Sequence, residues 1–454
     1  MSEEPVTRAA DNAAKVTESD RPVTFRDVFS VPEYRALYFS LLVNWVGDYL
    51  SRAAITVLVY QQSRSVLLSA AAFAVSFLPW IIGGTLLAAL TERYSYRRVL
   101  ILVDLTRMVL IALLLIPHLP VGWLLVLLFL SSLGAPPTQA ARSALLPMLI
   151  DRRRLPTAIA LNATTGQAAQ VVGYLVGATL ATALSPQVAL ATDAVTFGLS
   201  AVLIAVGVRP RPAAVAREQR THLLTESAEG FRLVFGHEAL RAIAFMAFVL
   251  TMFAVVPEGL AVAWAAQTDP DGVTQGFNQG LIMAAGPIGF VVGGILVSRI
   301  IRPSRRDRLI RPLAVLAAVA LVPAITGPPA PVVAILVAIS GLAQGGLMPT
   351  LNGKFVLILP HGYRARAFGV MQSAMQLSQF LAVILTGLLA ERFWLPLVVG
   401  VWSIGGTVAM GLLAARWPSQ GAFTPTPDTP EPGAVAHADA RATVSTSSVT
   451  PERR

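Results

Sequence analysis

Apolar residues occur in long, nearly uncharged runs along most of the chain. A run of about 17 to 25 residues crosses a hydrocarbon layer of about 30 Å as a helix. The runs predict helices near residues 35–60, 66–90, 99–117, 121–141, 157–184, 187–208, 241–264, 275–300, 312–326, 331–352, 367–389 and 394–415. The pattern therefore predicts an all-α integral membrane protein with twelve transmembrane helices.

The predicted helices fall into two sets of six, separated and flanked by polar segments. We expect an N-terminal six-helix bundle at 35–208 and a C-terminal six-helix bundle at 241–415. A cytoplasmic N-terminal segment at 1–34 and a cytoplasmic central loop at 209–240 complete this part of the chain. The tail at 416–454 is rich in Pro, Thr, Ser and Ala, a composition that predicts disorder.

Basic residues separate sharply between the two sides of the predicted membrane. One set of loops carries many arginines, including Arg97, Arg98, Arg152, Arg153, Arg154, Arg209, Arg211, Arg302, Arg305 and Arg306. The opposite loops at 118–120, 185–187, 265–273 and 327–330 contain no Lys or Arg, and only Arg64 and Arg392 break the pattern. Because cytoplasmic loops carry the excess of basic residues, both termini are expected in the cytoplasm, with the protein in the cell's inner (cytoplasmic) membrane.

Composition supports the membrane interpretation and excludes several other functions. Only 13% of the residues are charged, against about 25% in soluble domains, and the net charge of +10 lies in short loops, so we expect no nucleic-acid partner. The chain has no cysteine, no Walker-type phosphate loop and no histidine pair at metal-ligand spacing. We therefore expect no enzyme activity, no metal and no cofactor. We expect a monomer in the lipid bilayer, with a proton gradient as its energy source.

The two halves contain matching motifs in the same order. The matches are Gly83-Gly84 with Gly293-Gly294, Pro137-Thr138 and Arg142 with Pro349-Thr350 and Lys354, and Gln167 and Gln170 with Gln376 and Gln379. An internal duplication of this kind is typical of secondary transporters, which place the substrate cavity between the two repeats. The match also makes Arg142 and Lys354 equivalent positions at the cytoplasmic ends of their helices.

The loop after the second predicted helix resembles the signature loop of the major facilitator superfamily. Glu92, Arg93, Arg97 and Arg98 occupy the charged positions of that signature. Segments 104–107, 141–147 and 193–197 look like the branch that contains macrolide-efflux proteins and the enterobactin exporter. The resemblance implies two rocking bundles and a drug:proton antiporter.

A cytoplasmic gate is the function that we expect for the charged residues at the inner helix ends. These are Glu92, Arg93, Arg97, Arg98, Asp104, Arg107, Arg142 and Lys354.

Ionisable residues within predicted spans are costly, and each is a functional candidate. Asp48 and Arg52 lie one helical turn apart and are expected to pair, either as a structural ion pair or as a coupled pair in the cavity. Glu258 lies between Pro257 and Gly259, where a broken helix would expose it to the cavity or to an outer gate. Asp48 and Glu258 are the carboxylates that we expect to couple transport to protons, with a structural role in the gate as the alternative for Glu258. For Asp193 we expect either a structural role in hydrogen bonding or a role in proton coupling.

Neutral polar residues form a second set of cavity candidates. They are Asn44, Asn162, Gln167, Gln170, Gln376 and Gln379. The alternative role for these side chains is hydrogen bonding between helices.

The sequence favours a secondary active transporter that exports small amphipathic or apolar organic compounds, such as a drug, antibiotic or siderophore, in exchange for protons. Its small-molecule substrate is not identified by the residues. The alternatives are uptake of a small metabolite by the same fold and a non-transporting membrane sensor or scaffold.

Overall fold

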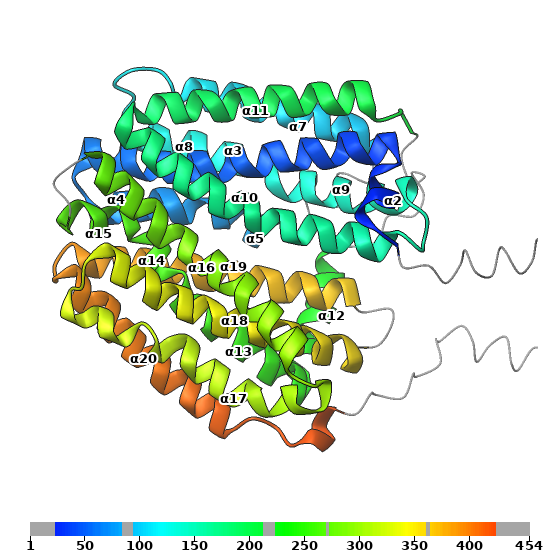
Figure 1. The fold of residues 1–454 in the computed structure, drawn as a ribbon, viewed down its shortest axis with the longest axis vertical. Coiled ribbons are helices and arrows are strands. Elements are labelled where there is room, and N and C mark those ends of the chain that lie inside the picture. The colour runs from blue at the N-terminus through cyan, green and yellow to red at the C-terminus, as the bar shows by residue number, and fades with distance from the viewer. Residues whose placement is uncertain (1–22, 84–93, 212–222, 269–271, 360–363, 424–454) are drawn as a thin grey trace, which may run out of the picture.

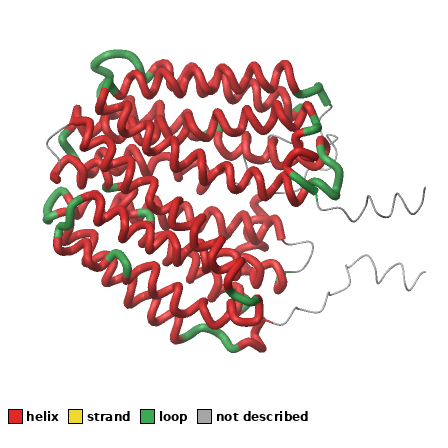
Figure 2. Tube along the Cα trace, viewed as in Figure 1, coloured by secondary structure: helices red, strands yellow, loops and turns green. Residues whose placement is uncertain are grey.

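The computed structural model describes residues 23–83, 94–211, 223–268, 272–359 and 364–423. All regular structure in these residues is helical, as Figure 2 shows. Glu92 and Arg93 lie outside the described residues, so the structure does not place these two predicted gate residues.

The N-terminal half contains six membrane-spanning segments, two of which are interrupted. Its helices are α2 (Phe25–Phe29), α3 (Pro32–Ser63), α4 (Val66–Ala74), η1 (Val75–Phe77), α5 (Leu78–Gly83), α7 (Tyr96–Leu113), α8 (Val121–Ser132), α9 (Ala135–Leu149), α10 (Leu155–Ala183) and α11 (Pro186–Gly207). The second segment comprises α4, η1 and α5, and the fourth comprises α8 and α9. The short helix α2 precedes the first segment and begins with a capping box between Thr24 and Asp27.

The C-terminal half repeats this arrangement. Its helices are α12 (Leu223–Gly236), α13 (Glu238–Ala254), α14 (Val256–Gly259), α15 (Ala261–Thr268), α16 (Gly272–Ile300), α17 (Pro303–Val319), η2 (Val322–Thr326), α18 (Ala330–Ile358), α19 (Arg364–Ala390), α20 (Leu395–Ala415) and η4 (Gln420–Phe423). Helices α13, α14 and α15 form one broken segment, and α17 continues into η2. Together with the N-terminal half, the described residues contain twelve membrane-spanning segments, as the apolar runs predict.

Three predicted boundaries differ from the structure. The ninth segment begins at Pro303 and carries Pro312 inside the helix, although the prediction began the segment at residue 312. The central segment 209–240, predicted as a loop, contains α12, whose Gly230 lies close to the backbone of Arg366 in α19. The predicted disordered tail begins with an ordered turn, because the Trp417 and Phe423 rings stack at 5.5 Å.

The two halves form two layers that meet face to face (Figure 1). The contact between them is made mainly by α10 with α16 and by α4 and α5 with α19. Across this interface α10 and α16 approach closely: a Cβ atom at Gly276 of α16 would lie 2.6 Å from the Ala178 carbonyl oxygen of α10. Gly280 meets the backbone of Leu175 in the same way, at 2.9 Å.

Inside the C-terminal half, α16 and α18 are in backbone contact. A Cβ atom at Gly293 would lie 1.9 Å from the Leu342 carbonyl oxygen, and one at Gly345 would lie 1.9 Å from the Phe290 carbonyl oxygen. Small residues allow helices to pack this closely in lipid, where association depends on van der Waals contact. The two helices therefore form a tightly packed pair next to the interface between the halves.

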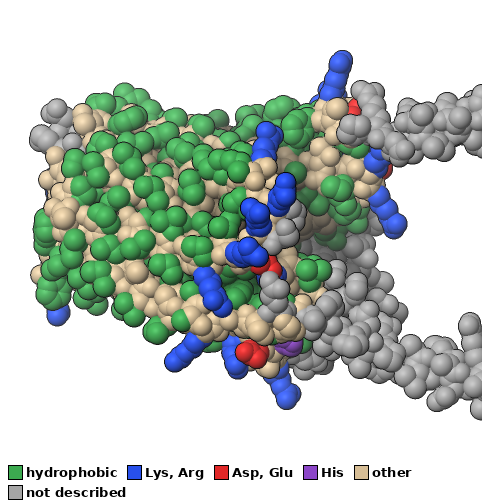
Figure 3. Space-filling model, turned by 60° about the horizontal axis from the view of Figure 1, so that its bottom comes forward, with side chains coloured by type: hydrophobic (Ala, Val, Ile, Leu, Met, Phe, Trp, Pro, Cys, Tyr) green, Lys and Arg blue, Asp and Glu red, His purple; other side chains and the backbone are tan. Residues whose placement is uncertain are grey.

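The lateral surface is hydrophobic, and Lys and Arg side chains gather at one end of the molecule (Figure 3). We call this end, which carries Arg98, Arg152, Arg209, Arg302 and Arg305, the arginine-rich end. Eight of the described helical segments are long and apolar enough to cross a membrane by themselves. The chain is therefore a multi-pass membrane protein.

Candidate transport cavity

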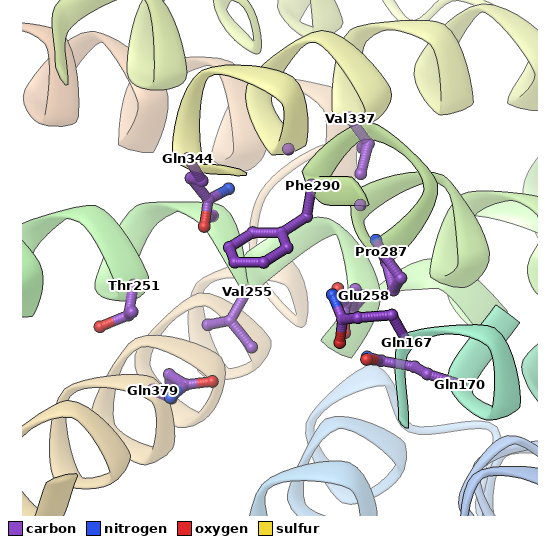
Figure 4. Close-up of a pocket in the computed structure, with 13 residues that line it drawn as sticks. Gln167, Gln170, Thr251, Val255, Glu258, Pro287, Phe290, Val337, Gln344 and Gln379 are labelled. Atoms are coloured by element: carbon purple, nitrogen blue, oxygen red, sulfur yellow. The ribbon is translucent and has the colours of Figure 1, made fainter. Parts of the chain in front are cut away.

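A cavity of about 170 Å³, which we call the central cavity, lies between the two halves. Its lining comes from five segments and includes Gln167, Gln170, Thr251, Glu258, Phe290, Gln344 and Gln379 (Figure 4). Glu258 supplies the charge among the described residues of this lining, and the four glutamines supply both donors and acceptors. The cavity can therefore hold a polar or cationic group together with an apolar part of a molecule.

Glu258 is placed in the cavity by the break in the seventh segment. Helix α14 has only four residues, with Pro257 near its start and Leu260 after its end. The carboxylate lies against Gly286 of α16, where a Cβ atom would be 3.0 Å from Glu258 Oε1. Of the two positions expected for Glu258, the cavity and an outer gate, the structure places it in the lining of the cavity.

A second cavity, of about 420 Å³, lies along the N-terminal half. Aromatic rings of α3 form one side of it, with Tyr34, Tyr38, Trp45 and Tyr49 in its lining. Gln167 of α10 lines both cavities, so the two are neighbours along one helix. Because Tyr34 belongs to the first turn of α3, the aromatic cavity extends toward the arginine-rich end.

The opposite end of the interface is closed by polar contacts between the halves. Gln279 of α16 donates hydrogen bonds to the Ala53 carbonyl at 3.2 Å and to Thr56 Oγ1 at 3.1 Å, both on α3. Glu391, just after α19, accepts hydrogen bonds from the Ser65 hydroxyl and from the Leu67 N–H at 2.9 Å. The structure therefore presents the cavities toward the arginine-rich end.

Glu391 is a carboxylate at the first turn of a helix from the other half. Ser65 is the N-cap of α4, and the N–H groups of such a turn favour a negative charge. The hydrogen bonds from Ser65 and Leu67 hold the pKa of Glu391 below its usual value. Sequence reasoning missed this contact, because Glu391 looks like an ordinary loop residue.

The structure corrects the predicted partner of Asp48. The carboxylate forms its ion pair with Arg107 of α7, both of whose terminal nitrogens point at it, and not with Arg52. Arg52 instead lies over the rings of Tyr49 and Phe73, 5.5 and 5.7 Å from their centroids. Neither Asp48 nor Arg52 lines the two cavities described above.

Asp104 and Arg142, predicted as gate residues, are buried inside the N-terminal half. Asp104 accepts hydrogen bonds from Asn44 at 3.0 Å and Ser200 at 2.6 Å, and Arg142 donates to Ser40 at 3.1 Å. Arg142 also borders the aromatic cavity. These side chains and Arg107 join α3, α7, α9 and α11, so their described contacts stabilise one half and do not bridge the two.

The remaining gate candidates lie at the arginine-rich end. Arg97 donates to the Ala205 carbonyl at 2.6 Å, while Arg98 is exposed. Lys354 donates to Asp307 at 2.8 Å and lies over the Phe423 ring. Arg142 and Lys354 are thus each bonded within their own half.

Among the neutral candidates, the structure brings four to the cavities. Gln167, Gln170 and Gln379 line the central cavity, and Asn162 lines the aromatic cavity, where it accepts a hydrogen bond from Tyr34. Asn44 does not line either cavity, because it is bonded to Asp104. Gln376 accepts a hydrogen bond from Gln379 at 2.9 Å and is absent from the lining.

Sequence reasoning missed Gln344 and Gln279. Both are polar side chains within otherwise apolar runs, which is the signal that would have found them. Gln344 lines the central cavity, and Gln279 contributes to the closed end.

Comparisons with known proteins agree with this architecture. The family model described as Major Facilitator Superfamily matches residues 37–328 and 274–450. A search of curated proteins gave no match. The family match spans most of the chain and includes both halves and the cavities between them.

Solved transporters share the fold. A POT family transporter in complex with 5-aminolevulinic acid has a TM-score of 0.70 at 11% identity, covering 88% of this chain and 99% of that one. A peptide transporter POT in complex with sulfate has a TM-score of 0.69 at 14% identity, covering 91% and 99%. The nucleoside transporter NupG has a TM-score of 0.68 at 11% identity, covering 86% and 99%. With its duplicated bundles and the family match, the chain belongs to the Major Facilitator Superfamily of membrane transporters.

Proposed function

We propose that the protein exports small amphipathic organic molecules across the cytoplasmic membrane in exchange for protons. The observation that carries this proposal is the central cavity between the halves, in which Glu258 faces an apolar and amide-rich lining. An adjoining aromatic cavity offers flat apolar surfaces. A molecule with an apolar ring system and a polar or cationic group fits both linings together.

The proposed orientation places the arginine-rich end in the cytoplasm. Substrate then enters through the aromatic cavity while the contacts of Gln279 and Glu391 keep the outer side closed. Rocking of the halves opens the outer side, and the sequence resemblance to efflux proteins supports export as the direction. The proton gradient provides the energy: a buried carboxyl group takes up a proton from outside and releases it inside, and this inward movement is coupled to the outward movement of substrate.

Signed flux in inverted vesicles tests this function. The vesicles receive erythromycin, a macrolide, or the fluorescent aromatic cation ethidium, with an imposed pH gradient and without ATP. We expect accumulation that follows the gradient and stops when a proton ionophore dissipates it. Uptake by right-side-out vesicles alone would establish the alternative, import of a small metabolite, and no flux of any compound class in either direction would favour a sensor or scaffold.

Glu258→Gln is the matching test of the cavity. It keeps the shape of the side chain and removes its charge, so we expect a loss of transport of at least about tenfold. Glu238→Gln is the control, because Glu238 starts the same segment but is exposed at the arginine-rich end. Equal transport by both variants at normal expression would reject a role of Glu258.

A further inference from the structure

A fully buried carboxyl group in the N-terminal half takes no part in the substrate cavities. Asp193 of α11 is 0% exposed. Its Oδ1 accepts a hydrogen bond from Thr196 Oγ1 at 3.2 Å, and the Ser51 side chain of α3 also contacts the carboxyl group. Its Oδ2 is buried without a hydrogen-bond partner. An ionised carboxylate in this position would have no ion pair with any described residue and one oxygen without a hydrogen bond, a costly state in a membrane interior.

The charged groups around Asp193 leave a proton as the natural neutralising ion. Asp48 of α3 and Arg107 of α7 are the charged groups that act on it electrostatically. The same two helices also carry Arg52 and Asp104, and Asp104 lies near Arg142 of α9; α10, which also packs against α11, carries no charged residue. Asp48 is paired with Arg107, and Asp104 accepts two neutral hydrogen bonds near Arg142. Arg52 lies over the aromatic rings of Tyr49 and Phe73. Among the three acids of this cluster, Asp193 is therefore the one with a buried oxygen that accepts no hydrogen bond.

A small polar cavity gives this cluster a route to water. It has a volume of about 50 Å³, and its polar lining includes Asp48, Arg52 and Arg107 together with Ser51, Ser131 and Ser132. This is room for at least one water molecule, with hydroxyl and charged partners to hold it. Ser51 belongs to this lining and contacts Asp193, so it connects the cavity with the carboxyl group.

The polar cavity and the substrate cavities share no lining residue. Helix α3 nevertheless separates them as a common wall: Asp48 and Ser51 face the polar cavity, while Trp45 and Tyr49 face the aromatic one. A shift of α3 on substrate binding therefore reaches both spaces at once.

We propose that Asp193 holds the exchangeable proton of the transport cycle, at a site inside the N-terminal half that is separate from the substrate cavity. This inference rests on the proposed function and assigns the transported proton to Asp193. Water in the polar cavity passes the proton through Ser51 to Asp193, the Asp48–Arg107 ion pair fixes the geometry, and Glu258 is left to contact substrate.

Infrared spectroscopy of the purified full chain tests the site without a substrate. A protonated carboxyl group absorbs apart from a carboxylate, and its band shifts when the proton exchanges for deuterium. We expect wild type to show a carboxylic acid band that shifts in deuterated buffer, and we expect Asp193→Asn to lose it. Glu258→Gln should keep the same band.

Each outcome decides the assignment. If the carboxylic acid band persists in Asp193→Asn, the assignment is overturned. It is also overturned if the band is lost in Asp193→Asn but does not shift in deuterated buffer in wild type, because the proton is then not exchangeable. If Asp193→Asn does not fold, Asp193→Glu serves instead, because it retains the carboxyl group and should shift the band frequency; an unshifted band overturns the proposal.

Flux measurements then separate this inference from the proposed function. With a compound transported by wild type, Asp193→Asn should lose gradient-driven accumulation at least tenfold and keep exchange of substrate at equal pH within twofold. Gradient-driven transport by Asp193→Asn at the wild-type level would reject the proton site alone. Absence of gradient-driven transport in wild type would reject the proposed function. The infrared measurement needs no substrate, so it would still decide whether Asp193 holds an exchangeable proton.

Discussion

Charged side chains within this membrane protein depend on partners from distant parts of the sequence. Asp48 and Arg107 are 59 positions apart, and the Arg107 guanidinium also lies 4.2 Å from the centroid of the Phe197 ring. Local spacing suggested Arg52 as the partner, because residues four apart share a helix face. The helix packing that brings Arg107 of α7 against Asp48 of α3 is not visible in that spacing, so local spacing predicts the wrong partner.

Asp48→Asn should destabilise the protein, because it leaves the Arg107 guanidinium without its anion. Loss of one member of a buried pair costs about 3 kcal/mol. Asp151→Asn is the matched control, since the Asp151–Arg154 pair is exposed and is worth less than about 1 kcal/mol. Thermal unfolding of both variants in detergent measures the difference; similar midpoints for the two would contradict a structural role for the Asp48–Arg107 pair.

At the level of helices, periodicity and composition predicted the segments well but not their interruptions. The break at Glu258 was expected from Pro257 and Gly259, whereas Pro312 and Pro349 lie within continuous helices. Neighbouring helices in a membrane can satisfy the backbone groups that a proline frees, so a proline alone does not decide whether a segment breaks. The cavity residues were partly predictable, because a polar side chain in an apolar run is conspicuous, but which face it occupies depends on packing.

The contact between α16 and α18 yields a sharp test of helix packing. Gly293→Ala should destabilise the C-terminal half by about 1 to 3 kcal/mol, because its new Cβ atom meets the Leu342 backbone. The neighbouring Gly294→Ala has ordinary contact, 3.5 Å from the Gly345 carbonyl oxygen, and should have little effect. Thermal unfolding in the same detergent compares them; an equal loss of stability in both would contradict close approach of Gly293 to Leu342 as the cause, because helix propensity alone favours Ala over Gly at both positions.

The Glu391 contact predicts a pH dependence of the closed outer end. Because hydrogen bonding lowers the pKa of Glu391 in this state, the contact is at full strength above the usual value of 4.5 and weakens as pH falls through the lowered pKa. We expect acid outside the membrane to favour opening between α4 and α19. Spin labels at Gln62 and Arg392, both exposed, report this separation as pH falls from about 7 to about 3.

Glu391→Gln is the decisive variant for this contact. It should open the outer end by about 1 kcal/mol, or roughly fivefold in population, and remove the pH dependence in that range. Glu238→Gln, exposed at the other end, should retain the wild-type response. A wild-type pH response in Glu391→Gln would assign the effect to another group.

In the whole molecule, the interface between the halves is tightly packed at one end and hollow toward the other. Gly276 and Gly280 permit the close packing, and the aromatic cavity occupies the other end. A substitution in the packed region therefore acts differently on the two states of an alternating-access cycle. It destabilises the state described here, in which this end is packed. It does not affect a state in which the halves are separated at this end.

Gly276→Ala should shift the population toward the outward-open state by roughly fivefold or more, the effect of about 1 to 3 kcal/mol of overpacking. Gly272→Ala is the matched control, because a Cβ atom there has ordinary contact at 3.7 Å. Since the chain has no cysteine, introduced cysteines carry the only labels, and a second pair at Arg152 and Arg305 reports the arginine-rich end. The two pairs should change in opposite directions; no change in either would contradict a role of Gly276 in closure.

The buried charges of the N-terminal half also bear on how the chain enters its membrane. Helices α3, α7 and α10 are not among the segments apolar enough to cross by themselves, and α3 and α7 each carry a charge of the Asp48–Arg107 pair. A single Asp or Arg at a helix centre disfavours insertion by the translocon by about 2.5 to 3.5 kcal/mol. We therefore expect α3 to enter lipid together with α7, because pairing of Asp48 with Arg107 lowers the cost of inserting both charges.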